Sequence, residues 1–274
     1  MRRAVYWPVT METMTNADFK SRYGPVAVVT GASSGIGKSF AVQLAAIGMD
    51  LVLVARRAER LEALAAQLEA AHRVQVTVCQ MDLGEADASM RIMDVTGPLD
   101  VGLLVSNAGY GFKGDHSAHD ASALAAMLMV NCNTPMQLTN GFIPRLRKRH
   151  KGGIILTSSV EALIGCPYSA AYSASKAFVK SLGEALWGEL TPDGIDVLTI
   201  CPGATDTEAL SRHGIDPSRL PNVMSPDEVA RLALERLRDG PVLIASEHYK
   251  ATFDTLLSMP RRDALTAMAK SMKG

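Results

Sequence analysis

The chain has 274 residues, and its 28 Lys and Arg balance 28 Asp and Glu, giving a formal net charge of +0 at pH 7. This balance gives no global attraction to nucleic acid or acidic membranes, so we expect neither as a partner. No uncharged apolar run reaches about 18 residues, so no membrane span is expected. With 47% apolar residues, the chain can form one domain with a full core.

The start of the chain shows no periodic apolar pattern. We expect residues 1–22 to be a loosely ordered extension, followed by a single domain over residues 23–274. No apolar core of about seven residues follows Arg2 and Arg3, which argues against a signal peptide. Scattered cysteines without a CxxC pair indicate reduced thiols in a cytoplasmic protein. They are Cys79, Cys132, Cys166 and Cys201.

Short apolar runs then alternate with helical patterns. A strand over 26–29 precedes a helix that opens at Gly35 and ends near Gly48, and a strand over 51–54 precedes a helix over 57–71. Nearly continuous apolar strands are typical of a parallel sheet buried on both faces. We therefore expect an α/β fold, a single doubly wound Rossmann-type domain with about seven parallel strands and helices on both faces. Further strands are predicted over 74–79, 101–105, 153–156, 195–200 and 242–245.

A glycine-rich turn, TGASSGIG over residues 30–37, joins the first strand to the first helix. Glycine permits a tight turn and lets a pyrophosphate approach the backbone near the positive end of a helix. The spacing TGxxxGxG differs from GxGxxG, but the strand–turn–helix context predicts a dinucleotide site. We expect the turn to contact the cofactor through Gly31, Ser33, Ser34, Gly35, Ile36 and Gly37.

The end of the second strand bears on the choice of cofactor. A carboxylate there would accept a hydrogen bond from a ribose 2′-hydroxyl, whereas an arginine accommodates a 2′-phosphate. The sequence has Arg56 and Arg57 and no carboxylate. One charge-assisted hydrogen bond gives about a 10- to 100-fold preference. We expect NADP(H) to be preferred, with NAD(H) possible. The alternative is that both arginines are solvated charges at the helix start.

The segment YSASK places a phenol and an ammonium four residues apart, on one face of a helix. A phenol has an unperturbed pKa of about 10, too high for proton transfer near neutral pH. A nearby cation lowers that pKa. Tyr172 and Lys176 therefore indicate a tuned acid/base, and together with the dinucleotide site they predict an oxidoreductase.

These motifs, in this order between about residues 25 and 245, make the chain resemble the short-chain dehydrogenase/reductase family. One departure is Ser106, where the family usually has asparagine. The resemblance adds further cofactor contacts: Asp82 and Leu83 beside the adenine; Asn107, Ala108 and Gly109 after the fourth strand; and Pro202, Gly203, Thr205 and Thr207 around the nicotinamide, with Tyr172 and Lys176 also contacting the cofactor.

The resemblance also implies a catalytic set, Asn131, Ser159, Tyr172 and Lys176, with Ser159 preferred over Ser158 because it lies 13 residues before Tyr172. Tyr172 would protonate the alkoxide that hydride transfer forms, and would act as base in the oxidation. Ser159 would donate a hydrogen bond to the carbonyl oxygen. Lys176 would bind the nicotinamide ribose, and Asn131 would hold a water that links Lys176 to solvent. The chemistry requires no metal.

The expected activity is NADP(H)-dependent interconversion of a small-molecule ketone or aldehyde with an alcohol. Pocket walls are expected over 110–114, 160–168 and 204–224, and the first two suit an apolar or neutral substrate. The third adds Arg212, His213 and Arg219, whose direction the sequence does not give. Two alternatives remain: an NAD-dependent alcohol or steroid dehydrogenase, and a catalytically silent protein that senses the cofactor. The complete catalytic set argues against the second. The resemblance further implies a homodimer or homotetramer, formed through the helix after Asn131 and the helix that carries Tyr172.

Three other patterns have simpler interpretations. Asp115, His116, His119 and Asp120 could suggest a metal site, but Asp favours helix starts, so we expect no metal. The basic run over residues 145–151 suits the C-terminus of a helix, where positive charge is favoured. The methionines of the last twenty residues could form an interface, a membrane-leaning patch or core packing, and we favour packing.

Overall fold

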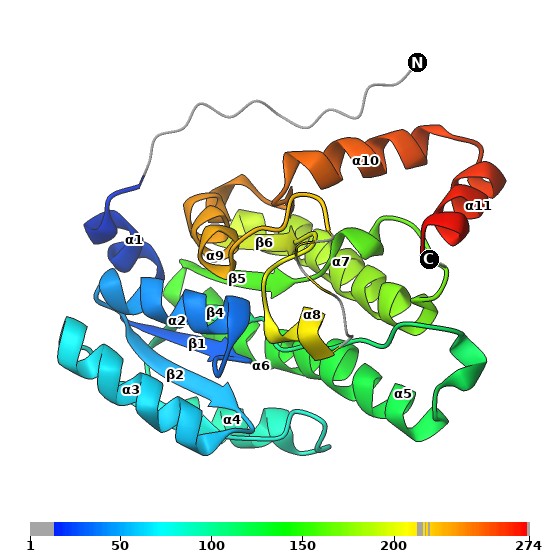
Figure 1. Cartoon of the computed structure of the whole chain (residues 1–274). Coiled ribbons are helices and arrows are strands. Elements are labelled where there is room, and N and C mark those ends of the chain that lie inside the picture. Colours follow the sequence, from blue (N-terminus) through cyan, green and yellow to red (C-terminus); the bar gives the residue numbers. More distant parts are fainter. Residues whose placement is uncertain (1–13, 213–215, 217, 219, 273–274) are drawn as a thin grey trace.

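The computed structural model describes residues 14–212, 216, 218 and 220–272. Its centre is a parallel sheet of seven strands in the order β3-β2-β1-β4-β5-β6-β7 (Figure 1). The doubly wound fold class is confirmed. The strands are β1 (Val26–Thr30), β2 (Asp50–Ala55), β3 (Val76–Gln80), β4 (Val101–Ser106), β5 (Gly152–Thr157), β6 (Ile195–Cys201) and β7 (Val242–Ile244).

Helices cover both faces of the sheet (Figure 1). One apolar core packs α2 (Gly35–Ala46), α3 (Ala58–His72) and α9 (Pro226–Glu235) against the first face. The other core packs α4 (Ala88–Thr96), α6 (Thr134–Arg149) and α7 (Ala170–Leu190) against the second. The remaining described helices are α1 (Asn16–Tyr23), α5 (Ala121–Leu128), α8 (Glu208–Arg212), α10 (Glu247–Ser258) and α11 (Arg261–Met272). Burial on both faces explains why the strand sequences are almost continuously apolar.

Regular structure begins closer to the N-terminus than the sequence suggests. Helix α1 begins after Thr15, whose hydroxyl accepts a hydrogen bond from the Asp18 backbone N–H. Phe19 and Tyr23 are buried in the first core, and the Tyr23 hydroxyl donates to Asp196 at 2.7 Å. The expectation of loose order is therefore wrong for residues 14–22, because a short helix gains order from these distant contacts. The expectation for residues 1–13 lies outside the described residues.

The order of the strands locates the site. β1 lies between β2 and β4. The connection after β1 runs to β2 on one side, whereas the connection after β4 runs to β5 on the other side, so the two leave the carboxyl ends of neighbouring strands in opposite directions. Ligands of open α/β sheets bind in the crevice outside such a switch point. Here the Thr30 hydroxyl at the end of β1 accepts hydrogen bonds from the backbone N–H groups of Asn107 (2.9 Å) and Ala108 (3.0 Å) after β4. The two turns are thereby tied together.

The polar segment 115–120 and the basic run 145–151 make structural contacts at helix ends. Asp120 accepts from the Ala123 N–H at the start of α5, which confirms the capping interpretation. The basic run closes α6, where Arg147 pairs with Asp193 at 2.7 Å. Within the described ranges, no three metal-binding side chains gather in one place. In the same part of the chain, no helix is long and apolar enough to cross a membrane.

We predict that Phe19→Ala lowers the free energy of unfolding by about 3 kcal/mol, because truncation of a buried aromatic side chain leaves a cavity. Ala17→Ser, an exposed change on the same helix, should leave the stability within about 0.5 kcal/mol of the wild type. Urea unfolding of both variants measures the difference. Equal stabilities would mean that α1 contributes nothing to the core.

Candidate active site

The glycine turn after β1 is closely packed and has unusual backbone angles. Gly31 and Gly35 have φ of +70° and +53°, in the region that favours glycine. A Cβ at Gly37 would lie 2.3 Å from the Gly31 carbonyl oxygen. Helix α2 begins at Gly35 and directs its first N–H groups toward the turn. The turn thus has the bare backbone and the positive helix end that suit a pyrophosphate group.

The two arginines after β2 have different surroundings. The Arg57 guanidinium donates to the hydroxyls of Ser33 (2.9 Å) and Ser34 (2.7 Å) in the glycine turn, and to Glu208 of α8 (2.8 Å). The Arg56 side chain is 67% exposed, and its nearest carboxylate, Asp82, is 3.8 Å away. Arg57 is therefore held as part of the turn, which excludes the interpretation that it is only a solvated charge.

One cavity of about 1790 Å³ unites the predicted residues. It extends from the glycine turn along the carboxyl ends of the strands to the start of α7. Two predicted residues are not on its wall: Gly37 packs behind Gly31, and Asn131 is buried. The predicted residues on the wall are Gly31, Ser33, Ser34, Gly35, Ile36, Arg56, Arg57, Asp82, Leu83, Asn107, Ala108, Gly109, Ser159, Tyr172, Lys176, Pro202, Gly203, Thr205 and Thr207.

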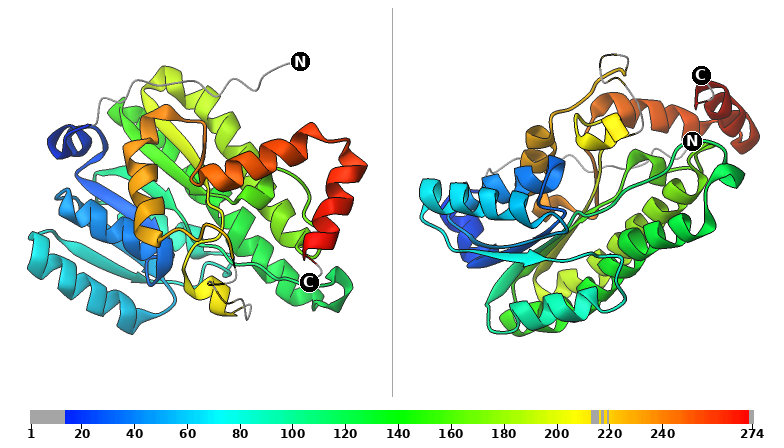
Figure 2. Two further views of the ribbon diagram at one scale, coloured as in Figure 1. Left: turned by 45° about the horizontal axis from the view of Figure 1, so that its top comes forward. Right: turned by 60° about the horizontal axis from the view of Figure 1, so that its bottom comes forward.

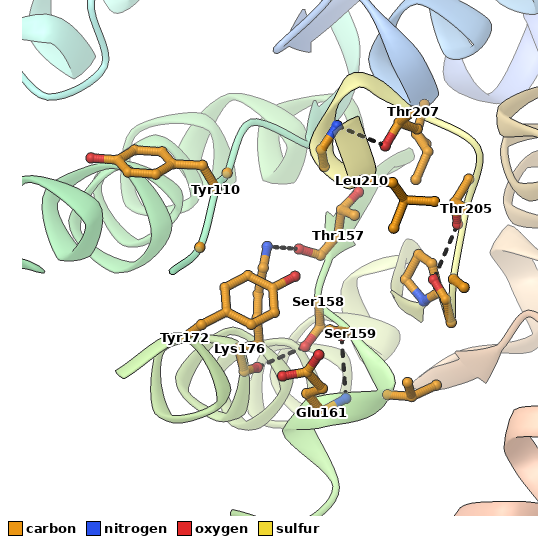
Figure 3. A pocket seen from close by; sticks show the side chains of 18 of the residues that line it. Tyr110, Thr157, Ser158, Ser159, Glu161, Tyr172, Lys176, Thr205, Thr207 and Leu210 are labelled. Carbon is orange, nitrogen blue, oxygen red and sulfur yellow. Dashed lines mark hydrogen bonds between the residues drawn. The ribbon is translucent and has the colours of Figure 1, made fainter. Parts of the chain in front are cut away.

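The phenol and the ammonium lie together on α7, next to Ser159 at the end of β5 (Figure 3). Lys176 is buried, its ammonium donates to the Thr157 carbonyl at 2.9 Å, and it lies 5.8 Å from the centre of the Tyr172 ring. The Ser159 hydroxyl accepts from the Glu161 backbone N–H at 3.2 Å. The neighbouring Ser158 hydroxyl donates to the Lys176 carbonyl, so it is engaged with the helix backbone. This arrangement favours Ser159 as the serine available to a substrate.

Burial dominates the electrostatics of this pair. It raises the pKa of Tyr172, and the carboxylate of Glu161 raises it further, while a hydrogen bond with Ser159 opposes the change. Burial also lowers the pKa of Lys176 to about 8. The expectation that Lys176 brings the pKa of Tyr172 below its ordinary value is wrong for this structure. The free-energy cost of removing the phenolate from water is larger here than its electrostatic stabilisation by the nearby cation.

Asn131 holds the loop after β4 rather than facing the cavity. It lies in η2 (Met129–Asn133), a π-helical turn of the kind that recurs at functional sites. Its amide accepts from the Tyr110 N–H (3.1 Å) and donates to the Tyr110 carbonyl (2.8 Å) and the Ser175 hydroxyl (3.0 Å). A Cβ at Gly109 would meet both Lys176 and Asn131. Asn131 therefore lies near Lys176, and its role in holding a water stays a prediction.

Described residues of all three predicted pocket segments line the cavity, while the side chains of Arg212, His213 and Arg219 lie outside the described part of the chain. Sequence reasoning missed a fourth wall. Helices α10 and α11, drawn in orange and red, lie outside the layers of the sheet fold (Figure 2). Phe253, Leu256, Met268 and Met272 line the cavity from this side. Met268 is buried in a third apolar cluster, which confirms the packing interpretation for it. In the sequence, the methionines of this segment gave a signal of apolar packing but none of a cavity wall.

A second feature that sequence reasoning missed is an ion pair beside the phenol. Lys113, after β4, pairs with Glu161 of η3 (Val160–Ala162). Lys113 also donates to the Ser169 hydroxyl at 3.0 Å, and it lies 5.4 Å from the centre of the Tyr172 ring. Both charged residues line the cavity. Their separation of 48 positions in the sequence left no local pattern to detect.

The fold and the site define a dinucleotide-dependent oxidoreductase architecture. The model of the short chain dehydrogenase family matches residues 25–216. The chain therefore belongs to the short-chain dehydrogenase family.

Three known proteins illustrate the similarity. A 7beta-hydroxysteroid dehydrogenase from Clostridium sardiniense is 30% identical over 254 residues, which cover 92% of this chain and 97% of the relative. A short-chain dehydrogenase from Sphingobium yanoikuyae, solved in complex with NADPH, is 35% identical with a TM-score of 0.79, covering 89% of this chain and 96% of that one. A bulky-bulky ketone specific alcohol dehydrogenase from Comamonas testosteroni is 31% identical with a TM-score of 0.75, covering 89% and 94%.

We predict that Gly37→Ala destabilises the fold by about 1–3 kcal/mol and weakens cofactor binding, because its Cβ would push the Gly31 carbonyl out of the turn. Gly188→Ala on α7 is the matched control, since a Cβ there meets nothing within 4 Å. The control should keep its affinity and gain about 0.5–1 kcal/mol from a more helical residue. Thermal unfolding and titration with NADPH measure both effects; unchanged binding by Gly37→Ala would contradict the assigned role of the turn.

Proposed function

We propose that the protein is an NADP(H)-dependent reductase that interconverts a ketone or aldehyde with an alcohol, with Tyr172 as the general acid and base. The observation that carries this proposal is the single cavity that joins the glycine turn to Ser159, Tyr172 and Lys176. A cofactor bound at the turn would reach along the strand ends toward the phenol. Membership of the short-chain dehydrogenase family supports the same reaction class.

Each group has a distinct task in this proposal. When bound, the nicotinamide supplies or accepts the hydride. Ser159 donates a hydrogen bond to the substrate oxygen and stabilises its developing negative charge. Tyr172 gives that oxygen its proton in the reduction and takes it back in the oxidation. Lys176, held by the Thr157 carbonyl, is directed at the region next to Gly109, where it can bind the nicotinamide ribose.

The preference for NADP(H) rests on the arginines and on similar proteins. Arg56 lines the cavity with an exposed side chain, so it can turn toward a 2′-phosphate. Arg57 fixes the two serines of the turn. The similar protein from Sphingobium yanoikuyae was solved with NADPH. NAD(H) is the alternative cofactor, and paired titrations with NADH and NADPH distinguish the two.

The substrate in this proposal is a bulky, largely apolar ketone or secondary alcohol. The apolar wall from α10 and α11 faces the same cavity as the phenol, and the cavity is large enough for a multi-ring molecule beside the cofactor. Similar proteins named for a hydroxysteroid and for bulky ketones support this class. A screen of ketones and alcohols of graded size with both cofactors tests it. A wild-type protein that binds NADPH but turns over no member of the panel would favour the cofactor-sensing alternative.

Assembly and compartment belong to the same proposal. We infer a homodimer or homotetramer that uses α6 and α7, because Met136, Phe178 and Trp187 expose apolar surface on these helices. The family resemblance assigns the subunit interface to the same two helices. A cytoplasmic location agrees with the four cysteines, none of which forms a disulfide.

Tyr172→Phe should reduce turnover by about 10²- to 10⁴-fold, because the ring keeps its packing but loses the proton. NADPH should bind as it does to the wild type. Steady-state rates and calorimetric titration measure these two quantities separately. Retention of more than about a tenth of the wild-type rate would contradict the assignment of Tyr172 as the general acid.

Arg56→Ala should weaken NADPH by about 10- to 100-fold and leave NADH almost unchanged, because only NADPH carries the 2′-phosphate. Arg57→Ala should weaken both cofactors, since its guanidinium holds Ser33 and Ser34 in the turn that both share. Titration of both cofactors against both variants gives the four affinities. Equal weakening of NADH and NADPH by Arg56→Ala would remove the basis for the cofactor preference.

A further inference from the structure

Glu161 brings a negative charge to the catalytic tyrosine. It lies two residues after Ser159, at the turn that leaves β5, and its side chain lies beside Ser159 and Tyr172 in Figure 3. Its Oε1 pairs with Lys113, whose ammonium lies 5.4 Å from the centre of the Tyr172 ring. The carboxylate is thus held next to the phenol by two elements that are far apart in the sequence.

The second oxygen of Glu161 is unusual. Oε2 is buried, and it accepts no hydrogen bond from any residue that the structure describes. A buried carboxylate oxygen without a donor carries a desolvation penalty of about 1–3 kcal/mol or more. The ion pair with Lys113 compensates only part of such a penalty. A charge kept in an unfavourable position next to the reacting group indicates a role in the reaction.

We propose that Glu161 is a positioning residue of the reaction, whose carboxylate, anchored by Lys113, keeps Tyr172 in the protonated form that carbonyl reduction consumes. This proposal rests on the proposed function and adds a direction to it. Reduction requires a phenol that donates a proton, and oxidation requires a phenolate that accepts one. A fixed negative charge beside the phenol favours the first state over the second.

The other groups around the phenol do not cancel this effect. Lys113 is already engaged by Glu161, and burial brings the pKa of Lys176 to about 8, so its positive charge weakens as the pH rises through that value. Burial also raises the pKa of the neighbouring thiols of Cys166 and Cys201 to about 12 and about 11, so both are neutral near pH 7. Among the described residues, the titratable groups that face Tyr172 or Glu161 include Lys113, Cys166, Lys176, Cys201 and Tyr249.

Glu161→Gln tests the proposal, because it removes the charge and keeps the shape. The pKa of Tyr172 should fall by about one unit, the size expected for one nearby charge in a partly solvated site. The alkaline limb of the reduction and the rising limb of the oxidation should both move to lower pH by that amount. Glu189→Gln is the matched control, since Glu189 is an exposed carboxylate on the same helix as Tyr172, and its profile should match the wild type.

A direct titration makes the test independent of any substrate. The ultraviolet absorbance of phenolate is followed against pH in the wild type and in Glu161→Gln, and each curve is corrected with the same protein carrying Tyr172→Phe. A lower midpoint for Tyr172 in Glu161→Gln supports the proposal even if no substrate has been identified. Failure of the substrate screen would count against the proposed function alone.

Two results would overturn the inference. One is a Tyr172 midpoint in Glu161→Gln that is equal to or above that of the wild type. The other is a higher KM with unshifted pH profiles, which would make Glu161 a substrate contact. Circular dichroism confirms folding of each variant, and Glu161→Met provides a second neutral side chain of similar length if the glutamine variant does not fold.

Discussion

The junction between β1 and β4 is the constraint on which the site depends. Thr30 ends β1, and its buried hydroxyl accepts from two consecutive backbone N–H groups after β4. Without these bonds, two partly buried donors would lack protein partners at the point where the sheet opens. The bonds also set the glycine turn beside Asn107–Gly109. From there the loop continues to Tyr110, which Asn131 holds, so the position of the catalytic wall follows from the same junction.

Desolvation is the largest influence on the pKa values of Tyr172 and Lys176. The charged forms of Lys176 and of the Tyr172 phenol are both costly here, so the pKa of Tyr172 rises, the pKa of Lys176 falls to about 8, and the two values move apart. The raised pKa of Tyr172 favours the protonated phenol, the form that donates a proton in a reduction. The carboxylate of Glu161, which is paired with Lys113 and lines the same cavity, raises the pKa of Tyr172 further.

The cavity has two halves of different origin. The cofactor half is made by the turns that follow successive strands, and its residues lie within short motifs. The other half is closed by α10 and α11. These two helices pack against η3 and the end of β6 in a third apolar cluster. Reaction class and substrate class therefore depend on different parts of the chain. Such a division lets one catalytic framework serve many substrates.

The sequence by itself determined the seven strands, the glycine turn, and the placement of Tyr172 and Lys176 on one helix, because each depends on spacing within about ten residues or on a strand end. Only the tertiary structure decided the helix before β1, the attachment of Arg57 to the turn, the pairing of Lys113 with Glu161, and the wall from the last two helices. Those features depend on contacts between residues that are distant in the sequence. Likewise, the pKa of Tyr172 follows from burial, which a local spacing of tyrosine and lysine does not specify.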